Sequence, residues 1–186
     1  MAFLPIQRNT VALTTLALIA ALGVVARFTL QIPVIPNAVV LTPGFMFSLL
    51  GGVVGGLPGG IIVGAIVGAS GALSGTELPL LPMFGNICLG IGSGYAVYFA
   101  TRDTLKYYAM VLFGGGIIGG FIPTMTVFSS LVDPLIVNLI AATIDMAQAF
   151  LWAFAALIVE SKIIRPILGH YLYSEGRIEE LGERDG

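Results

Sequence analysis

Long stretches without a charged residue alternate with short polar breaks along the chain. No Asp, Glu, Lys or Arg occurs between Arg27 and Glu77, between Glu77 and Arg102, or between Lys106 and Asp133. A helix needs about 20 predominantly apolar residues to cross the hydrocarbon core of a membrane. The pattern therefore predicts an all-α membrane protein, a compact bundle of six transmembrane helices over about residues 10–31, 39–56, 58–74, 81–101, 106–129 and 134–160.

The boundary between the second and third predicted helices rests on a glycine-rich turn. The sequence from Gly55 to Gly60 contains four glycines and Pro58, a combination that breaks a helix and favours a tight turn. Glycines also recur every four residues from Gly52 to Gly68, which leaves one helix face bare, so that a neighbouring backbone can approach closely. We interpret these glycines as packing devices. The alternative, a phosphate-binding loop, lacks the Gly-Lys-Ser/Thr ending of such loops.

The segment after the first predicted helix, residues 28–40, does not have a helical pattern. Pro33 and Pro36 bias the residues before them away from helical geometry. The segment is apolar, and irregular backbone of this kind cannot face lipid, because its polar groups would have no partners there. We expect it to fold over one end of the bundle as a cap.

Basic residues predict the orientation of the chain in the membrane. Cytoplasmic loops of membrane proteins carry an excess of Lys and Arg. With the N-terminus in the cytoplasm, Arg27 is the only basic residue near a helix end that lies outside, whereas the cytoplasmic side holds Arg8, Arg102, Lys106, Lys162 and Arg165. Both termini are then cytoplasmic, and residues 170–186 form a polar cytoplasmic tail.

The composition supports this class and argues against others. Of the 186 residues, 10% are charged and 57% are hydrophobic, and the net charge is −2. A soluble core cannot be so large relative to its surface, and the net charge gives no argument for nucleic-acid binding. We expect a single integral membrane domain over residues 1–186, multi-pass in the cell membrane.

Residues that carry enzyme or metal chemistry are scarce. Cys88 is the only cysteine and His170 the only histidine, so a cysteine-based metal site is not expected and a His-rich one cannot form. Intramembrane aspartyl catalysis needs a close pair of carboxylates, and Asp145 is the only acidic residue inside the last two predicted helices before Glu160, where the sixth ends. We expect no catalytic residue, no metal and no cofactor.

The last long apolar segment carries a polar stripe. At about 100° per helical residue, Asn138, Asp145, Gln148 and Trp152 fall within a sector of about 80°. An ionised carboxylate at membrane depth costs at least about 2.5 kcal/mol, so such residues usually face a bundle interior or a cavity and mark a site. The alternative is a protonated Asp145 that bonds a neighbouring helix for packing alone.

Depth in the membrane separates the members of this stripe and adds residues from other helices. At about 1.5 Å per residue, Asn86 and Asn138 lie within about 8 Å of the outer ends of their helices, and Asp145 about 16 Å down. Trp152, at about 27 Å, is expected in the inner belt or in packing. Polar groups thus cluster in the outer half, and the substrate-binding candidates are Asn86, Asn138, Asp145, Gln148, Arg27 and Thr124.

Two features of the first predicted helix have two interpretations each. Arg27 either binds a ligand carboxylate or anchors the helix at the outer interface, where its charged end reaches the headgroups. Ala17, Ala20 and Ala21 form a face of small residues, which makes close contacts either within the bundle or with a separate membrane subunit.

Taken together, these features resemble a known family. The six predicted helices, Ala17-x-x-x-Ala21, the proline-containing segment 31–37 and the glycine-rich hairpin 49–68 are similar to the substrate-binding S components of energy-coupling factor (ECF) transporters. The resemblance implies uptake of a vitamin-like small organic molecule through an outward-facing pocket. The first outer loop would close that pocket as a gating loop, through Phe28, Gln31, Ile32, Ile35 and Asn37.

The resemblance also implies partners. Helix one would contact a membrane coupling subunit through Ala17, Ala20 and Ala21, and that subunit would carry two ATPase subunits. The His-rich N-terminus expected of nickel and cobalt members is absent, which points to an organic solute. Asn86, Asn138 and Asp145 would then hydrogen-bond an amide- or heterocycle-bearing solute, and ATP hydrolysis by the partner would drive its release inside.

Two other classes remain open from the sequence. One is a self-sufficient carrier or channel, in which Asp145 titrates during transport and the glycine face forms a homo-oligomer interface. The other is a structural membrane subunit without a ligand. Many secondary carriers show inverted repeats, and the sequence has no convincing repeat of this kind, which counts against the carrier.

Overall fold

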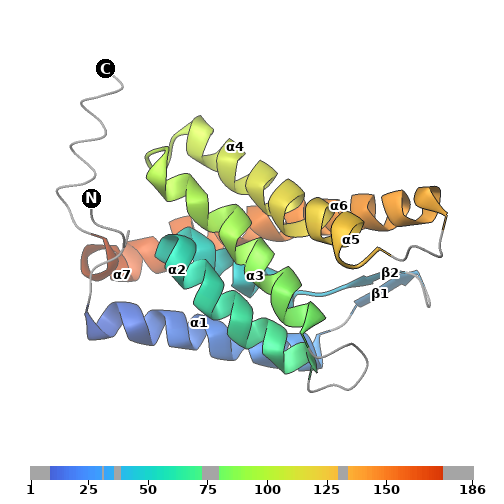
Figure 1. Cartoon of the computed structure of the whole chain (residues 1–186). Coiled ribbons are helices and arrows are strands. Elements are labelled where there is room, and N and C mark those ends of the chain that lie inside the picture. Colours follow the sequence, from blue (N-terminus) through green and yellow to red (C-terminus); the bar gives the residue numbers. More distant parts are fainter. Residues whose placement is uncertain (1–8, 31, 36–38, 73–79, 130–133, 174–186) are drawn as a thin grey trace.

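Helices form nearly all of the structure, a computed structural model that describes residues 9–30, 32–35, 39–72, 80–129 and 134–173 (Figure 1). The α-helices are α1 (Thr10–Thr29), α2 (Gly44–Ala72), α3 (Leu81–Gly94), α4 (Leu105–Phe113), α5 (Ile122–Thr126), α6 (Leu135–Val159) and α7 (Arg165–Leu172). A 3₁₀ turn, η1 (Tyr95–Tyr98), extends α3; the π-helical segments η2 (Gly114–Phe121) and η3 (Glu160–Ile164) join α4 to α5 and α6 to α7. The predicted helical class is confirmed.

Four helical segments are long and apolar enough to cross a membrane: Thr10–Thr29, Gly44–Gly71, Leu105–Thr126 and Leu135–Leu172. Large apolar side chains also cover their outer faces. On α1, for example, Leu13, Leu18 and Leu22 are all more than half exposed. Such an outer surface suits lipid rather than water, which is compatible with a multi-pass membrane protein.

The second helix, α2, is bent into two arms at Gly56. This residue has φ 63° and ψ −156°, a conformation that glycine adopts without steric cost. Ser48 in the first arm and Gly64 in the second both reach Asn86 of α3. The chain therefore reverses at Gly56, and the predicted helix break between residues 56 and 58 is confirmed.

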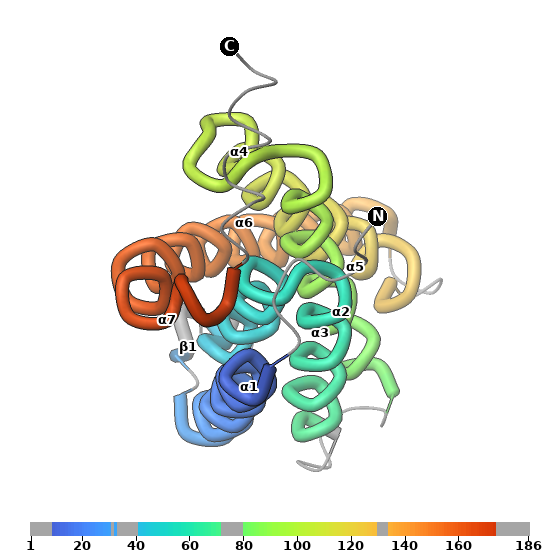
Figure 2. Tube along the Cα trace, turned by 90° about the vertical axis from the view of Figure 1, so that its left-hand side faces the viewer, coloured from blue at the N-terminus to red at the C-terminus, as the bar shows by residue number. Residues whose placement is uncertain are grey.

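The two arms of α2 occupy the middle of the bundle, against α3 (Figure 2). The glycine face predicted from the sequence makes this contact. A methyl group added at Gly60 would lie 2.3 Å from the carbonyl oxygen of Gly90, and one at Gly64 would lie 2.4 Å from that of Asn86. The backbones of α2 and α3 thus touch, and the glycine face is used inside the bundle rather than left for a second copy of the chain.

A short hairpin precedes α2, and here the predicted boundaries are wrong. The strands β1 (Ile32–Ile35) and β2 (Val39–Leu41) pair in antiparallel register, with Ile32 opposite Leu41. The second helix therefore begins at Gly44 rather than near residue 39, because residues 39–41 bond to β1 instead of starting a helix. The non-helical geometry predicted for residues 32–35 from Pro33 and Pro36 is confirmed, since these residues form a strand.

The end of the bundle away from this hairpin is closed by buried charge. Glu160 has no exposed surface, and Arg165 donates to both carboxylate oxygens, from Nε at 3.0 Å and from Nη2 at 2.5 Å. The Tyr173 hydroxyl donates to Glu160 at 3.0 Å, and burial raises the pKa of this hydroxyl well above its usual range, so it keeps its proton.

This pairing corrects the predicted end of the last helix. The first charge after the apolar run, Glu160, was expected to end it near residue 160, with a tail from residue 170. Instead the helix continues through η3 and α7 to Leu172, because Arg165 neutralises Glu160 inside the protein. Arg165 also pairs with Asp103 in the loop before α4.

A second arginine secures the bend in α2. Arg102 Nη2 donates to the carbonyl oxygens of Val53 at 3.1 Å and Val54 at 3.2 Å. These carbonyls end the first arm, and the break at Gly56 removes their partners from the helical ladder. The guanidinium also lies 4.0 Å from the centre of the Tyr173 ring. A positive charge at a helix C-terminus is favourable as well.

We expect Gly60→Ala to destabilise the bundle, because the added methyl group would push the second arm of α2 away from the backbone of α3. Overpacking of this kind costs about 1–3 kcal/mol. Gly169→Ala is the matched control, since a methyl group there meets side chains alone, the nearest 3.2 Å away. Thermal unfolding in detergent measures the effect, and an unchanged unfolding temperature for Gly60→Ala would contradict the backbone contact.

Candidate functional site

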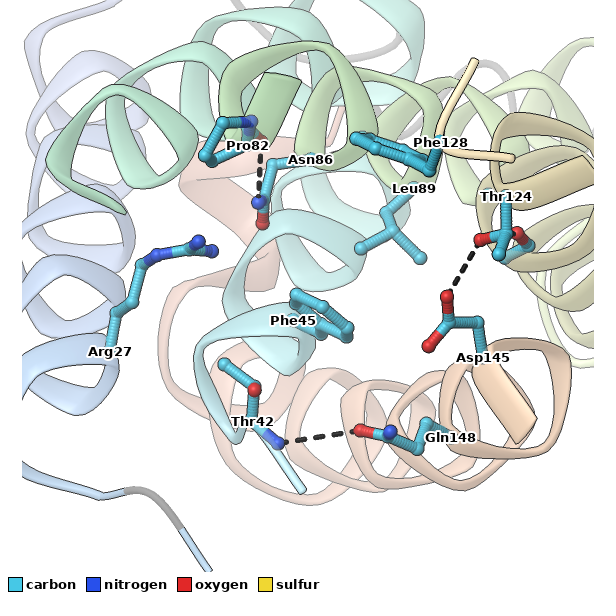
Figure 3. Close-up of a pocket in the computed structure, with 13 residues that line it drawn as sticks. Arg27, Thr42, Phe45, Pro82, Asn86, Leu89, Thr124, Phe128, Asp145 and Gln148 are labelled. Carbon is cyan, nitrogen blue, oxygen red and sulfur yellow. Dashed lines mark hydrogen bonds between the residues drawn. The ribbon is translucent and has the colours of Figure 1, made fainter. Parts of the chain in front are cut away.

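A cavity of about 340 Å³ lies at the end of the bundle where α1 finishes and α2 and α3 begin (Figure 3). Each of five helical segments contributes to its wall: α1, α2, α3, the stretch from η2 to α5, and α6. The lining residues are Arg27, Thr42, Phe45, Pro82, Gly85, Asn86, Leu89, Gly119, Gly120, Thr124, Phe128, Asp145 and Gln148.

Five of the six substrate-binding candidates line this cavity: Arg27, Asn86, Thr124, Asp145 and Gln148. The sixth, Asn138, does not. It shares the helix face of Asp145, but it lies two turns, or about 10 Å, nearer the start of α6. Trp152 packs against the hydrophobic core instead of the cavity.

Asn86 is fixed in the cavity wall by two hydrogen bonds. Its side chain is 2% exposed. Its Oδ1 accepts from the Ser48 hydroxyl at 2.7 Å, and its Nδ2 donates to the carbonyl of Pro82 at 2.8 Å. Because the Pro82 carbonyl oxygen can only accept a hydrogen bond, the Asn86 atom that faces it must be the amide nitrogen, and this fixes the orientation of the side-chain amide. Nδ2 retains a second hydrogen.

Asp145 and Thr124 connect α6 to α5 across the cavity. The Thr124 hydroxyl oxygen lies 2.7 Å from Asp145 Oδ2 and 3.0 Å from the carbonyl of Gly120, one turn earlier. Gly120 allows the helices to approach, since a methyl group there would lie 2.7 Å from the backbone carbonyl oxygen of Asp145. The π-helical turns of η2, rich in glycine, therefore bring Thr124 within reach of the carboxyl group. Segments of this type are frequent at functional sites.

Gln148 links the cavity to the β-hairpin. Its Oε1 accepts from the backbone N–H of Thr42 at 3.4 Å. Thr42 directly follows β2, so the hairpin and the cavity share a structural connection. Gln148 is 7% exposed, and its amide nitrogen makes no hydrogen bond within the part of the chain that the structure describes.

The predicted gating residues are placed differently from the expectation. Phe28 is the penultimate residue of α1 and is 52% exposed, and Ile32 in β1 is 49% exposed. Neither lines the cavity. The backbone of Ile35 belongs to β1, and Gln31 and Asn37 lie outside the described residues. The residues from this region that reach the cavity are Thr42 and Phe45, just beyond the hairpin.

Sequence reasoning missed the apolar part of the wall. Phe45, Leu89 and Phe128 line the cavity, and Figure 3 shows Phe45 and Leu89 between Arg27 and Asp145. A signal was available for Leu89, because it lies three residues after Asn86 in α3, whereas Phe128 follows the end of α5. Residues three apart in a helix share a face.

The small residues of α1 divide between two environments. Ala20 is 2% exposed and packs in the core, so the prediction that it faces a partner is wrong, because a side chain enclosed by the bundle cannot reach one. Ala17 and Ala21 are on the exposed side of α1, together with Leu18 and Leu22.

The cavity has the chemistry of a binding site. It combines an arginine, a carboxyl group and two amides with aromatic and aliphatic walls, as ligand pockets typically do. Among the described residues, no three His, Cys, Asp or Glu side chains gather to hold a metal ion. Comparisons with family models, curated proteins and solved structures found no match.

We expect Ser48→Ala to destabilise the cavity wall, because it leaves the buried Asn86 Oδ1 without its donor. An unsatisfied buried polar atom costs about 1–3 kcal/mol. Thr143→Ala is the control, since the Thr143 hydroxyl is exposed and bonds only the carbonyl of Leu139 in its own helix. Thermal unfolding of both variants measures the difference; equal effects would show that Ser48 does not hold Asn86.

Proposed function

We propose that this chain captures a small organic solute within the membrane, as the substrate-binding S component of an ECF-type, ATP-driven importer of vitamin-like molecules. One observation supports this above all. Five polar residues chosen from the sequence alone, on α1, α3, α5 and α6, converge on one cavity of about 340 Å³. Pockets for small molecules typically measure about 300–1,000 Å³ and combine apolar walls with a few polar groups.

In this proposal the chain crosses the membrane six times: by α1, the two arms of α2, α3 with η1, α4 to α5, and α6 to α7. Among the basic residues that the structure describes, Arg27 is at the cavity end, and the opposite end holds Arg102, Lys106, Lys162 and Arg165. Basic residues favour the cytoplasmic side. The cavity then opens outside, and both termini are cytoplasmic.

The exposed side of α1 is the proposed contact with a membrane coupling subunit. Ala17 and Ala21 would allow close approach of another helix, and Leu18 and Leu22 flank them on the same exposed surface. Two ATPase subunits on that partner would supply the energy for reorientation and release. The chain itself is proposed to have no enzymatic activity, no cofactor and no metal.

A self-sufficient carrier has less support. That alternative used the glycine face as an interface between copies, and the glycines at positions 60 and 64 contact α3 instead. Solute uptake into liposomes that contain the purified chain alone tests it directly. We expect no uptake without the ATPase partners, because nothing then drives reorientation; uptake by the chain alone would overturn the proposed importer mechanism.

We expect Asp145→Ala and Asn86→Ala to weaken solute binding about tenfold or more, since each removes hydrogen-bonding groups from the cavity wall. Asn138→Ala is the matched control, because Asn138 is polar and on α6 but does not line the cavity. Mass spectrometry of the solute retained by each purified variant measures the change. Unchanged binding in both cavity variants would remove the proposed pocket.

A further inference from the structure

The atoms that α6 presents to the cavity form a hydrogen-bond acceptor beside a donor. Asp145 and Gln148 are three residues apart, so their side chains are neighbours on one helix face. Asp145 Oδ2 is 2.7 Å from the Thr124 hydroxyl, and Gln148 Oε1 accepts from the N–H of Thr42. Among the described residues, Asp145 Oδ1 and Gln148 Nε2 have no hydrogen-bond partner, and both belong to residues that line the cavity.

The role of the Gln148 atom follows from its partner, and that of the Asp145 atom follows from where the carboxyl proton lies. The N–H of Thr42 only donates, so the Gln148 atom that meets it is the oxygen, and the NH₂ group is left over. The Thr124 hydroxyl has one hydrogen. It can donate to Asp145 Oδ2. It can instead donate to the Gly120 carbonyl, and Oδ2 then carries a proton and donates to Thr124. In both of these arrangements Asp145 Oδ1 accepts, and the proposed pairing uses a carboxyl group that carries no proton on Oδ1.

An acceptor beside a donor is complementary to a solute with an N–H next to a C=O. Amides, lactams, ureas and many nitrogen heterocycles have such an edge. The match is specific, because a solute that offers only acceptors or only donors would leave one of the two protein atoms without a partner in the cavity.

The cavity wall across from Asp145 carries a positive charge, that of Arg27. Figure 3 shows Arg27 pointing into the cavity from the side across from Asp145. Its guanidinium rests against Gly71, where a methyl group would lie 2.2 Å from Nε and Nη2, so the glycine makes room for it. A guanidinium keeps its charge and matches carboxylate and phosphate groups geometrically. It is the only basic group among the residues that line the cavity.

We propose that the solute is bipolar: an amide-type edge binds Asp145 and Gln148, and a carboxylate or phosphate at its other end binds Arg27. Phe45 and Leu89, between these two walls, contact a short apolar body. The carboxyl group of Asp145 disfavours the reversed orientation, because it would meet an anion. This inference rests on the proposed function and adds the chemical class of the solute.

The first test identifies what the protein binds. Purified full-length chain is incubated with deproteinised extract of the cells that express it, washed and denatured, and the released solutes are profiled by mass spectrometry in both polarities. We expect one compound with an acidic group and an amide-type edge. A released compound that lacks either group overturns the inference but leaves the capture function standing. No released compound at all contradicts both.

The second test uses the released compound and a neutral derivative in which its acidic group is esterified. We expect Arg27→Gln to weaken binding of the acidic compound about 10- to 100-fold, Arg27→Lys to weaken it less, and Lys106→Gln to change nothing. The neutral derivative should bind wild type and Arg27→Gln equally. This comparison within one variant separates lost recognition from lost folding, and equal weakening of both compounds would contradict the role of Arg27.

The third test addresses the other end of the solute. We expect Gln148→Leu, which keeps the side-chain size but removes the donor, to weaken binding of both compounds by a similar factor, because both retain the amide-type edge. Leu151→Gln, one turn further along α6 on its exposed side, is the control for a change of polarity. Unchanged affinity in Gln148→Leu would contradict the proposed pairing.

Discussion

The direct contact of backbones between α2 and α3 is the constraint on which the other features depend. Gly60 and Gly64 bring the second arm of α2 against α3, and the bend at Gly56 returns the chain so that the first arm reaches α3 as well. Only at this separation can the Ser48 hydroxyl bond Asn86 at 2.7 Å. Larger residues in place of these glycines would widen the bundle and separate the walls of the cavity.

Buried polar groups at the two ends of the bundle differ in how many of their hydrogen bonds the protein itself supplies. At one end, both carboxylate oxygens of the buried Glu160 accept hydrogen bonds, from Arg165 and Tyr173, and such a network tends to rigidify a structure. At the other end, Asp145 and Gln148 are only half used by protein partners. Their polar atoms without a partner among the described residues therefore belong to residues that line the cavity, as the proposed ligand site requires.

Local patterns predicted much of this arrangement. Hydropathy predicted the helical class, and glycine spacing predicted a close backbone contact without naming the partner helix. The polar stripe and the depth of polar residues on other helices predicted five residues of the cavity wall. The failures come from partners that are distant in sequence. Strand β2 forms because β1 pairs with it, the last helix passes Glu160 because Arg165 neutralises it, and Ala20 is buried by neighbouring helices. Asn138 does not line the cavity because it lies two turns nearer the start of α6 than Asp145, and a place on the same face in the outer half of the helix was too coarse to separate the two.

The bend at Gly56 makes the first arm of α2 short compared with the thickness of a membrane. From Gly44 to Gly55 the first arm rises only about 18 Å, well short of the roughly 30 Å hydrocarbon core. In the proposed orientation the first arm is therefore a short span, and the carbonyls at its end need protein cover, because open carbonyls are not tolerated beside lipid. The guanidinium of Arg102 supplies this cover by donating to the carbonyls of Val53 and Val54.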